Sequence, residues 1–216
     1  MMGSTKIKVC GIMYAADVAT VNHFGADYIG VNCWAGSPRF VHPALRKNLL
    51  REIKSEQRIA VTVNPTLSET QQLIDEGFAA VQIHFDPSTK ACDVQAISQK
   101  IGAENIWLAP KVPNGMDWPE EIISLAKTFL HDAHAADAFG GTGKQGDWER
   151  FKKLKNLHQN KIWVLAGGLG PKNILEALGS NADILDLNSG VEISPGLKSA
   201  EKLAEICSLL LNNKQS

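Results

Sequence analysis

Two polar side chains stand where short apolar runs of the sequence end, and both are of types that transfer protons. Cys10 closes the run that begins at Ile7, and Asp132 closes the run that begins at Thr128. A thiolate can accept a proton, and a protonated carboxyl group can donate one. An ordinary thiol has a pKa of about 8.5 and an ordinary aspartate one of about 4, so each needs its pKa moved toward neutrality. The pair suggests general acid–base catalysis.

Each of these residues also has a simpler interpretation. A lone cysteine at the end of a strand is commonly a small core residue. Asp137 lies in the same loop as Asp132, but only Asp132 directly follows the apolar run, and Asp137 is equally well a solvated loop residue. His131 and His134 flank Asp132 without a set of further ligands, so we expect no metal site.

Polar residues also lie at or near the ends of several other apolar runs, and few of them suit a purely apolar core. His84 is as easily a hydrogen-bonded strand-end residue as a ligand contact. The full set of such residues, beyond the pair above, is Asn64, Gln82, His84, Lys111 and Asp186.

Three glycine-rich segments are typical of loops that bind phosphate. Glycine lets backbone amides approach the oxygens closely, and the start of a following helix adds a positive dipole end. Each segment is also compatible with an ordinary tight turn. They are Gly140 to Lys144, Gly167 to Pro171 and Asn188 to Glu192.

Short β-branched apolar runs alternate about eight times with stretches of helical periodicity, which predicts buried parallel strands joined by helices. The chain of 216 residues shows no linker, so we expect one (β/α)8 TIM-barrel domain over residues 1–216. A doubly wound sheet is disfavoured because no Gly-x-Gly-x-x-Gly follows the first run. The runs are Ile7 to Cys10, Tyr28 to Cys33, Ile59 to Val63, Ala79 to His84, Ile106 to Val112, Thr128 to Asp132, Ile162 to Ala166, and Ile184 to Leu187.

Helix ends are marked by specific residues. Ser68 and Gln71 form a possible capping box for a helix that Gly77 would end, and Pro171 fits the first turn of a later helix. A glycine in the left-handed conformation is expected to lead into a strand at Gly25, Gly77 and Gly179. The last helix should bury Leu203, Ile206, Cys207 and Leu210.

Composition excludes several classes of partner. The formal net charge is −1, and the Lys and Arg residues are scattered, so neither nucleic acid nor an anionic membrane is an expected partner. No stretch approaches the roughly 20 apolar residues of a membrane span, and the first residues do not form a signal segment. The four cysteines lack metal-type spacing, which favours a reduced, cytoplasmic protein.

Six segments form an ordered series along nearly the whole chain. They are Lys8-Val9-Cys10-Gly11-Ile12, Ser37-Pro38-Arg39, Val81-Gln82-Ile83-His84, Gly140-Gly141-Thr142-Gly143-Lys144 with Asp147-Trp148, Gly167-Gly168-Leu169, and Ser189-Gly190-Val191-Glu192 with Pro195-Gly196. In sequence and order this series resembles the phosphoribosylanthranilate isomerase family. The resemblance implies an Amadori rearrangement of N-(5'-phosphoribosyl)anthranilate in tryptophan biosynthesis, without a metal or organic cofactor.

The resemblance also implies roles for individual residues. Cys10 would remove the proton from C2 of the sugar, and Asp132 would protonate the ring oxygen. Arg39 would face the anthranilate carboxylate, and Asp186 would hold ribose hydroxyls. The remaining candidate contacts to the sugar phosphate substrate are His84, Gly141, Gly168, Ser189 and Gly190.

Several positions depart from the family pattern and keep other functions open. Asn32, Phe85 and Asn188 stand where other residues are usual, so a related isomerase acting on another N-substituted ribosylamine phosphate is an alternative. A non-catalytic phosphate-binding barrel is a second alternative, against which the presence of both Cys10 and Asp132 argues. Indole-glycerol-phosphate synthase is disfavoured because the chain lacks that family's N-terminal extension. We expect a monomer or a homodimer.

Overall fold

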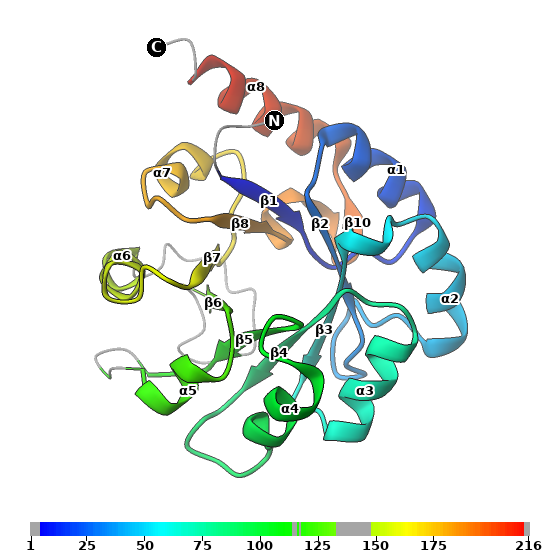
Figure 1. The fold of residues 1–216 in the computed structure, drawn as a ribbon. Helices are drawn as coiled ribbons and strands as arrows, with labels where there is room; N and C mark the ends of the chain where they lie inside the picture. Colours follow the sequence, from blue (N-terminus) through cyan, green and yellow to red (C-terminus); the bar gives the residue numbers. More distant parts are fainter. Residues whose placement is uncertain (1–4, 114–115, 117, 133–147, 214–216) are drawn as a thin grey trace.

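Eight parallel strands close into a barrel in the computed structural model, which describes residues 5–113, 116, 118–132 and 148–213. Neighbours in sequence are neighbours in the barrel, and β1 closes it by pairing with β8 (Figure 1). The strands are β1 (Lys6–Val9), β2 (Tyr28–Asn32), β3 (Arg58–Val63), β4 (Ala80–Phe85), β5 (Ile106–Pro110), β6 (Thr128–Asp132), β7 (Ile162–Ala166) and β8 (Ile184–Leu187).

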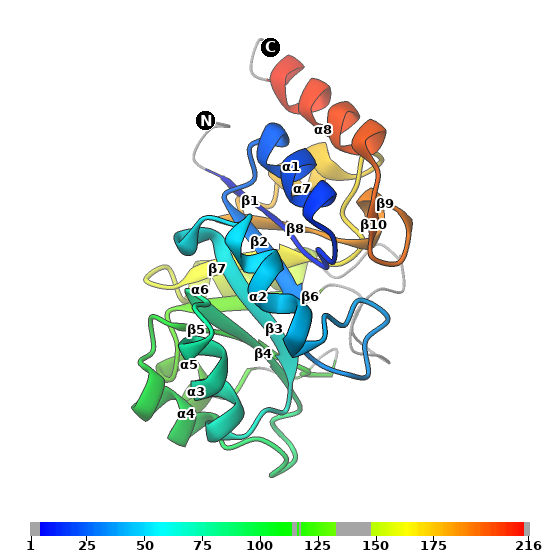
Figure 2. The same cartoon turned by 90° about the vertical axis from the view of Figure 1, so that its right-hand side faces the viewer.

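Helices follow the strands and cover the outside of the barrel (Figures 1 and 2). The last of them, α8, packs beside α1 and α7. The described helices are α1 (Ala15–Phe24), α2 (Pro43–Arg51), α3 (Leu67–Asp75), α4 (Val94–Ile101), α5 (Glu120–Ser124), α6 (Trp148–Leu157), α7 (Ile174–Leu178) and α8 (Ala200–Asn212), with the short 3-10 helices η1 (Ser55–Gln57) and η2 (Ser189–Val191). Among the described residues, no helix has the length and apolar character needed to cross a membrane.

The predicted barrel class is confirmed, and each predicted apolar run overlaps a strand of the barrel to within two residues at either end. The largest difference is in β5, which ends at Pro110 rather than at Val112. Proline lacks an amide hydrogen and cannot donate a hydrogen bond to the neighbouring strand, which agrees with the end of β5 at Pro110. Lys111 therefore lies just beyond its strand.

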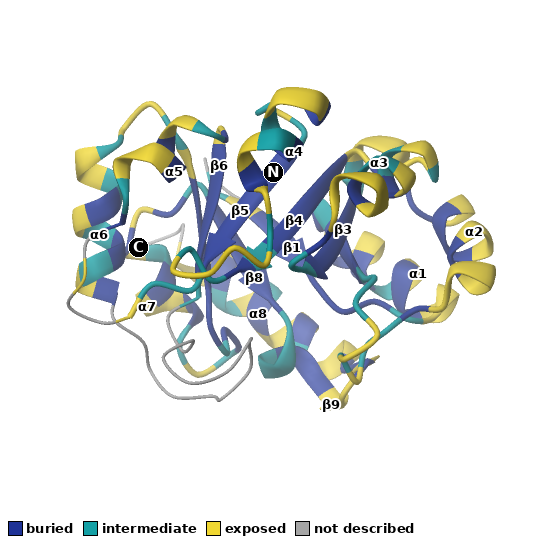
Figure 3. Cartoon of the chain, turned by 90° about the horizontal axis from the view of Figure 1, so that it is seen from below, coloured by how far each residue is buried: buried dark blue, intermediate teal, exposed yellow. Residues whose placement is uncertain are grey.

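Alternation along the strands separates two cores. Side chains that point outward pack under the helices in one large cluster, represented by Val81, Phe129 and Leu185. Side chains that point inward fill the amino-terminal end of the barrel, represented by Trp107 and Val164. Figure 3 shows the resulting pattern, with buried strands inside and helices exposed along their outer faces. Many of the inward positions nearer the carboxyl ends of the strands are polar, and with apolar neighbours such as Val61 and Leu130 they line the site described below.

The capping box of α3 lies two residues before the predicted one. The Thr66 hydroxyl accepts a hydrogen bond from the Glu69 amide at 3.2 Å, and the Glu69 carboxylate accepts one from the Thr66 amide at 2.7 Å. The prediction of Ser68 and Gln71 was wrong because α3 begins at Leu67, which places Ser68 inside its first turn. A threonine with a glutamate three residues later satisfies two amides at once.

Two of the three predicted left-handed glycines are confirmed. Gly25 and Gly77 have φ of 86° and 98°. Gly179 was predicted wrongly, since its φ is −65° and Asn181 takes the left-handed conformation at φ 59°. Asparagine tolerates this region better than most residues, so the left-handed residue stands two positions later than predicted.

Two further details of the carboxyl-terminal part bear on its predicted helices. Pro171 precedes the first residue of α7, Ile174, by a turn, so its assignment to the first helical turn was wrong. In α8 the apolar stripe is present as predicted, with Leu203, Ile206 and Leu210 buried and Cys207 partly so.

A two-stranded antiparallel hairpin, β9 (Glu192–Ser194) and β10 (Leu197–Lys198), connects η2 to α8. Gly196 forms part of its turn with a φ of 86°. The hairpin brings Glu192 and Lys198, which are both buried, to the carboxyl-terminal end of the barrel.

Candidate active site

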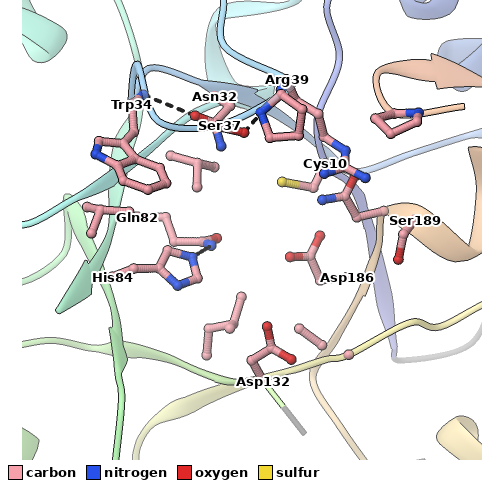
Figure 4. A pocket seen from close by; sticks show the side chains of 18 of the residues that line it. Cys10, Asn32, Trp34, Ser37, Arg39, Gln82, His84, Asp132, Asp186 and Ser189 are labelled. Atoms are coloured by element: carbon pink, nitrogen blue, oxygen red, sulfur yellow. Dashed lines mark hydrogen bonds between the residues drawn. The ribbon is translucent and has the colours of Figure 1, made fainter. Parts of the chain in front are cut away.

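A cavity of about 410 Å³ opens at the carboxyl ends of the strands. This volume is within the usual range for pockets that hold small molecules. Figure 4 shows side chains from strands around the barrel pointing into it. The lining includes Cys10, Asn32, Trp34, Arg39, Gln82, His84, Asp132, Gly168, Asp186, Asn188 and Ser189.

Most of the residues selected from the sequence meet at this cavity. Gly190 packs directly behind the lining, and Gly141 lies in residues 133–147, outside the described residues. Asn64 and Lys111 are not among the residues that line the cavity. The predicted residues that do line it are Cys10, Arg39, Gln82, His84, Asp132, Gly168, Asp186 and Ser189.

Cys10 directly follows β1 and is 5% exposed. Its amide donates to the Leu187 carbonyl at 2.8 Å, which fixes the backbone beside β8. Its sulfur rests against Gly30, where an added Cβ would lie 2.7 Å from Sγ. Burial raises the pKa of the Cys10 thiol, although the positive charge of Lys8 opposes that rise. The thiol is thus held in place at the cavity wall and has a cation beneath it.

Asp132 is the last residue of β6 and reaches into the cavity from a different side than Cys10 (Figure 4). Its neighbour His131 points the opposite way, into the outer core, where its ring lies 6.1 Å from that of Phe151. His134 and Asp137 lie outside the described residues. In the part of the chain that the structure describes, no group of three or more His, Cys, Asp or Glu side chains has the arrangement of a metal site.

Asp186 lies in β8, and its two carboxylate oxygens have different surroundings. Oδ2 accepts a hydrogen bond at 2.8 Å from Nζ of Lys8, and the two residues are paired in register between β1 and β8. Oδ1 is buried and has no hydrogen-bond partner within the described residues. Burial raises the pKa of Asp186, against the attraction of Lys8. An orphaned carboxylate oxygen at a cavity wall is suited to accept a hydrogen bond from a ligand hydroxyl.

Gln82 and His84 are alternate residues of β4 and form one hydrogen-bonded pair in the cavity wall. Their Nε2 atoms lie 2.8 Å apart, so the Gln82 amide donates and the imidazole accepts. Burial, helped by repulsion from Lys8, lowers the pKa of His84 to about 4. His84 is therefore neutral near neutral pH, with its remaining proton on Nδ1.

Arg39 is held by a carboxylate of the protein itself. Its Nε and Nη2 donate to the two carboxylate oxygens of Glu192 at 2.9 and 2.6 Å. Glu192 also accepts from Nζ of Lys198 at 2.7 Å and from the Gly196 amide at 3.0 Å. These partners outweigh burial and lower the pKa of Glu192. One edge of the guanidinium is thus occupied, and the edge that carries Nη1 has no hydrogen-bond partner among the described residues.

The glycine-rich loops after β7 and β8 touch each other through their backbones. A Cβ on Gly170 would lie 2.7 Å from the Gly190 carbonyl oxygen, and a Cβ on Gly190 would collide with the Leu169 carbonyl. The two glycines are therefore needed for close approach, beyond any role in turns. The amides of Gly168 and Ser189 donate to no acceptor among the described residues, which leaves them suited to an anion.

Sequence reasoning missed three charged residues of this site. Lys8 and Glu192 were noted only as parts of motifs and Lys198 was not singled out, yet they hold Asp186 and Arg39 in place. A signal existed for Lys8, since a lysine inside a buried apolar run, two residues before Cys10, must share the inward face with it. Glu192 and Lys198 gave no such signal because a hairpin outside the barrel brings them there.

The fold and this cavity define a class, the (β/α)8-barrel enzymes that keep acid–base side chains and glycine-rich loops at the carboxyl ends of their strands. A family model described as N-(5'phosphoribosyl)anthranilate (PRA) isomerase matches residues 7–208. The chain belongs to this family.

Individual relatives agree over almost their whole length. The N-(5'-phosphoribosyl)anthranilate isomerase of Zymomonas mobilis is 32% identical over 207 residues, which are 94% of this chain and 96% of that one. The protein of the same name from Trichormus variabilis is 35% identical over 204 residues, 92% of this chain and 95% of that one. The crystal structure of phosphoribosyl anthranilate isomerase from Thermus thermophilus superposes with a TM-score of 0.79 at 25% identity and covers 97% of this chain and 100% of that one.

Proposed function

We propose that this chain catalyses the Amadori rearrangement of N-(5'-phosphoribosyl)anthranilate to 1-(2-carboxyphenylamino)-1-deoxyribulose 5-phosphate, with Cys10 as general base and Asp132 as general acid. The observation that carries the proposal is that a thiol directly after β1 and a carboxyl group at the end of β6 face one cavity that also contains Arg39. The reaction is an isomerisation, so it needs proton transfers and no external oxidant or reductant.

The two proton transfers divide between the two residues. Asp132 gives a proton to the furanose ring oxygen, the ring opens, and C1 becomes an iminium carbon. The C2 hydrogen is then acidic, and the Cys10 thiolate takes it. The resulting enolamine becomes the ketone by a second proton shift. Cys10 and Asp132 stand on different strands at different sides of the cavity, which suits transfers at two separate atoms of one substrate.

Three side chains orient the substrate in this proposal. Arg39 meets the aryl carboxylate with the guanidinium edge that Glu192 leaves open. Asp186 accepts a ribose hydroxyl on its unpartnered Oδ1. His84, neutral because its pKa is about 4, offers the hydrogen on Nδ1 to the substrate.

The phosphate is proposed to lie over the loops after β7 and β8. The Gly168 and Ser189 amides are open there, and the contact between Gly170 and Gly190 keeps the two loops adjacent. Gly141, on the loop after β6, is proposed as a further phosphate contact by the resemblance to the family. An anion bound only at the opposite end of the barrel would contradict this placement.

Two departures from the family pattern keep a second substrate worth testing. Asn32 and Asn188 both line the cavity, whereas Phe85 is buried in the outer core and has no place in substrate choice. Asn32 accepts from the Trp34 amide at 3.0 Å, and Asn188 accepts from Lys198 at 3.1 Å. Both amides thus have structural partners, but a related N-substituted ribosylamine phosphate remains the second candidate.

The test is a fluorescence assay that follows the loss of N-(5'-phosphoribosyl)anthranilate, generated in place because the compound is labile. Turnover by the purified chain supports the proposal. Turnover of only an analogue that carries another amine would support the second candidate. Tight binding of phosphoribosylanthranilate and of the analogue, without turnover of either, would favour a non-catalytic barrel. We place the reaction in the cytoplasm, in a single domain that acts as a monomer or homodimer.

A further inference from the structure

A lysine is completely buried inside the barrel, beneath the cavity. Lys8 lies in β1, between Ile7 and Val9, which point outward into the main core. Since side chains alternate along a strand, Lys8 and Cys10 share the inward face. The exposed fraction of Lys8 is 0%, so its ammonium group has no direct access to water.

One carboxylate balances this charge. Nζ of Lys8 lies 2.8 Å from Oδ2 of Asp186, and the other carboxylate oxygen stays unpartnered at the cavity wall. The remaining ionisable groups that interact with this pair from neighbouring strands and loops are Cys10, His84 and Lys198. The lysine therefore sits between the apolar layer of the barrel and the proposed catalytic groups.

Stability does not account for a charge in this place. Removing two charges from water costs several kcal/mol for each ion, and buried ion pairs replaced by apolar residues often leave proteins equally or more stable. Inward side chains toward the amino-terminal end of the barrel, among them Ile184, Trp107 and Val164, are apolar, and a methionine would extend that layer. The remaining explanation for the buried charge is a role of Lys8 in the site above it.

We propose that Lys8 is a positioning residue for the isomerisation: its ammonium group stabilises the Cys10 thiolate and holds Asp186 so that the free carboxylate oxygen faces the substrate. The inference rests on the proposed role of Cys10 as base. It assigns to Lys8 no contact with substrate, since the side chain is sealed from the cavity by its burial.

The charges around Cys10 support this assignment. Burial raises the pKa of the thiol, Lys8 is the largest influence that lowers it, and Asp186 raises it again. For Lys8 itself, burial favours the neutral amine, but attraction to Asp186 and Cys10 outweighs burial and raises the pKa. Lys8 therefore stays cationic, and its removal must make the thiolate harder to form.

The test measures thiolate formation directly, without turnover. Substrate-free protein is alkylated with iodoacetamide over a range of pH, and modification of Cys10 is followed by mass spectrometry of its peptide. At a fixed pH near 8, Lys8→Met should slow alkylation about tenfold or more, because a nearby cation commonly stabilises an anion by at least that factor. Asp186→Asn should speed it.

Matched variants separate this effect from damage to the fold. Lys6→Met makes the same change in the same strand and on the same face, but at an exposed position where Nζ contacts the Tyr28 hydroxyl at 3.1 Å, and it should leave Cys10 alkylation unchanged. The double variant Lys8→Met with Asp186→Asn removes both buried charges and avoids an unpaired one. It should alkylate more slowly than Asp186→Asn alone.

A kinetic measurement completes the test. The rise of kcat with pH should move to higher pH in Lys8→Met, while the KM changes less than kcat. An unchanged alkylation profile in folded Lys8→Met, or a double variant that matches Asp186→Asn, would overturn the inference. If the alkylation profile moves as expected but the chain does not convert phosphoribosylanthranilate, the proposed substrate fails and the coupling of Lys8 to Cys10 stands.

Discussion

The two ends of the barrel interior are built from the same strands and differ in almost every other respect. At the amino-terminal end, inward side chains such as Trp107, Val164 and Ile184 fill the space with carbon. At the carboxyl-terminal end, inward side chains of the same or adjoining strands, such as Asp132 and Asp186, surround a cavity. The alternation along a strand determines only that a side chain points inward. The position of that side chain along the barrel axis decides whether it stabilises the fold or lines the site.

Two of the unsatisfied polar atoms lie at the cavity end of the barrel. Gln82 Oε1 and Asp186 Oδ1 are buried without a hydrogen-bond partner among the described residues, and both belong to the carboxyl-terminal end. Each such atom carries a desolvation cost of about 1–3 kcal/mol. The apolar end contributes the favourable burial that offsets this cost. Variants at the two ends should therefore affect different measurements.

The largest expected effect is on turnover, at the polar end. Cys10→Ser and Asp132→Asn should each lower kcat about a hundredfold to ten-thousandfold, because each removes a group that transfers a proton. A serine hydroxyl is too weak a base near neutral pH, and an amide cannot donate a carboxyl proton. Phosphate affinity should hardly change, since other loops bind it. Turnover, calorimetric binding of a product analogue and circular dichroism measure the three quantities.

Two results would contradict this assignment of roles. If Asp132→Asn stays active and Asp137→Asn is inactive, the acid is misassigned within its loop. If the variants of Cys10 and Asp132 both keep full activity, the acid–base mechanism is wrong. A loss of the dichroism signal would instead show that these residues support the fold.

The converse expectation applies to the apolar end. Trp107 is 5% exposed, and its ring packs edge-on against Tyr28 with centroids 5.1 Å apart. Trp107→Ala should lower the free energy of unfolding by about 3–5 kcal/mol, through lost burial and the remaining cavity. Urea denaturation measures this loss. The kcat per folded molecule should stay near that of the unchanged protein, and a loss of kcat as large as that in Cys10→Ser would erase the contrast between the two ends.

His84 lies at the polar end of the barrel, but its titration should be seen in the free energy of unfolding. Its pKa is about 4 in the folded protein and about 6.5 when unfolded, so the unfolded chain binds the proton first as pH falls. Stability should therefore be lost between about pH 6.5 and pH 4, by about 1–3 kcal/mol, since the cavity gives the ring some contact with water. Urea denaturation at several pH values should show a smaller loss in His84→Gln than in the unchanged protein. Equal losses would contradict this role of His84.

The barrel and most of its inward residues could be predicted from the sequence because they depend on local pattern. Buried parallel strands are short apolar runs, and Cys10 and Asp132 stand at the ends of two of them. The contacts that orient these groups are not local. Glu192 reaches Arg39 across 153 positions of the chain, and Lys8 reaches Asp186 across 178, so only the closed barrel shows that they meet.

Helix ends show the same limit on a smaller scale. Thr66 and Ser68 are both followed, three residues later, by a residue of a type that can complete a capping box. Which of them caps α3 depends on where β3 ends and the chain turns, and the structure selects Thr66. Local signals of similar strength are decided by the packing of the elements around them.

The smallest expected effect concerns Arg39, at the rim of the polar end, and it depends on the guanidinium having two usable edges. Glu192 occupies Nε and Nη2, so a substrate carboxylate must approach the edge that carries Nη1. Arg39→Lys keeps the charge, but an ammonium group is a point charge and cannot hold two carboxylates through two planar edges. The KM for phosphoribosylanthranilate should therefore rise about tenfold while kcat changes little, since a contact made equally in ground state and transition state affects binding alone. A ribosylamine phosphate made with aniline, which lacks the carboxylate, is the matched control and should show the same KM with both proteins. If Arg39→Lys binds the two compounds as the unchanged protein does, the carboxylate lies elsewhere, and Arg39 belongs with Glu192 and Lys198 to the structure of the hairpin.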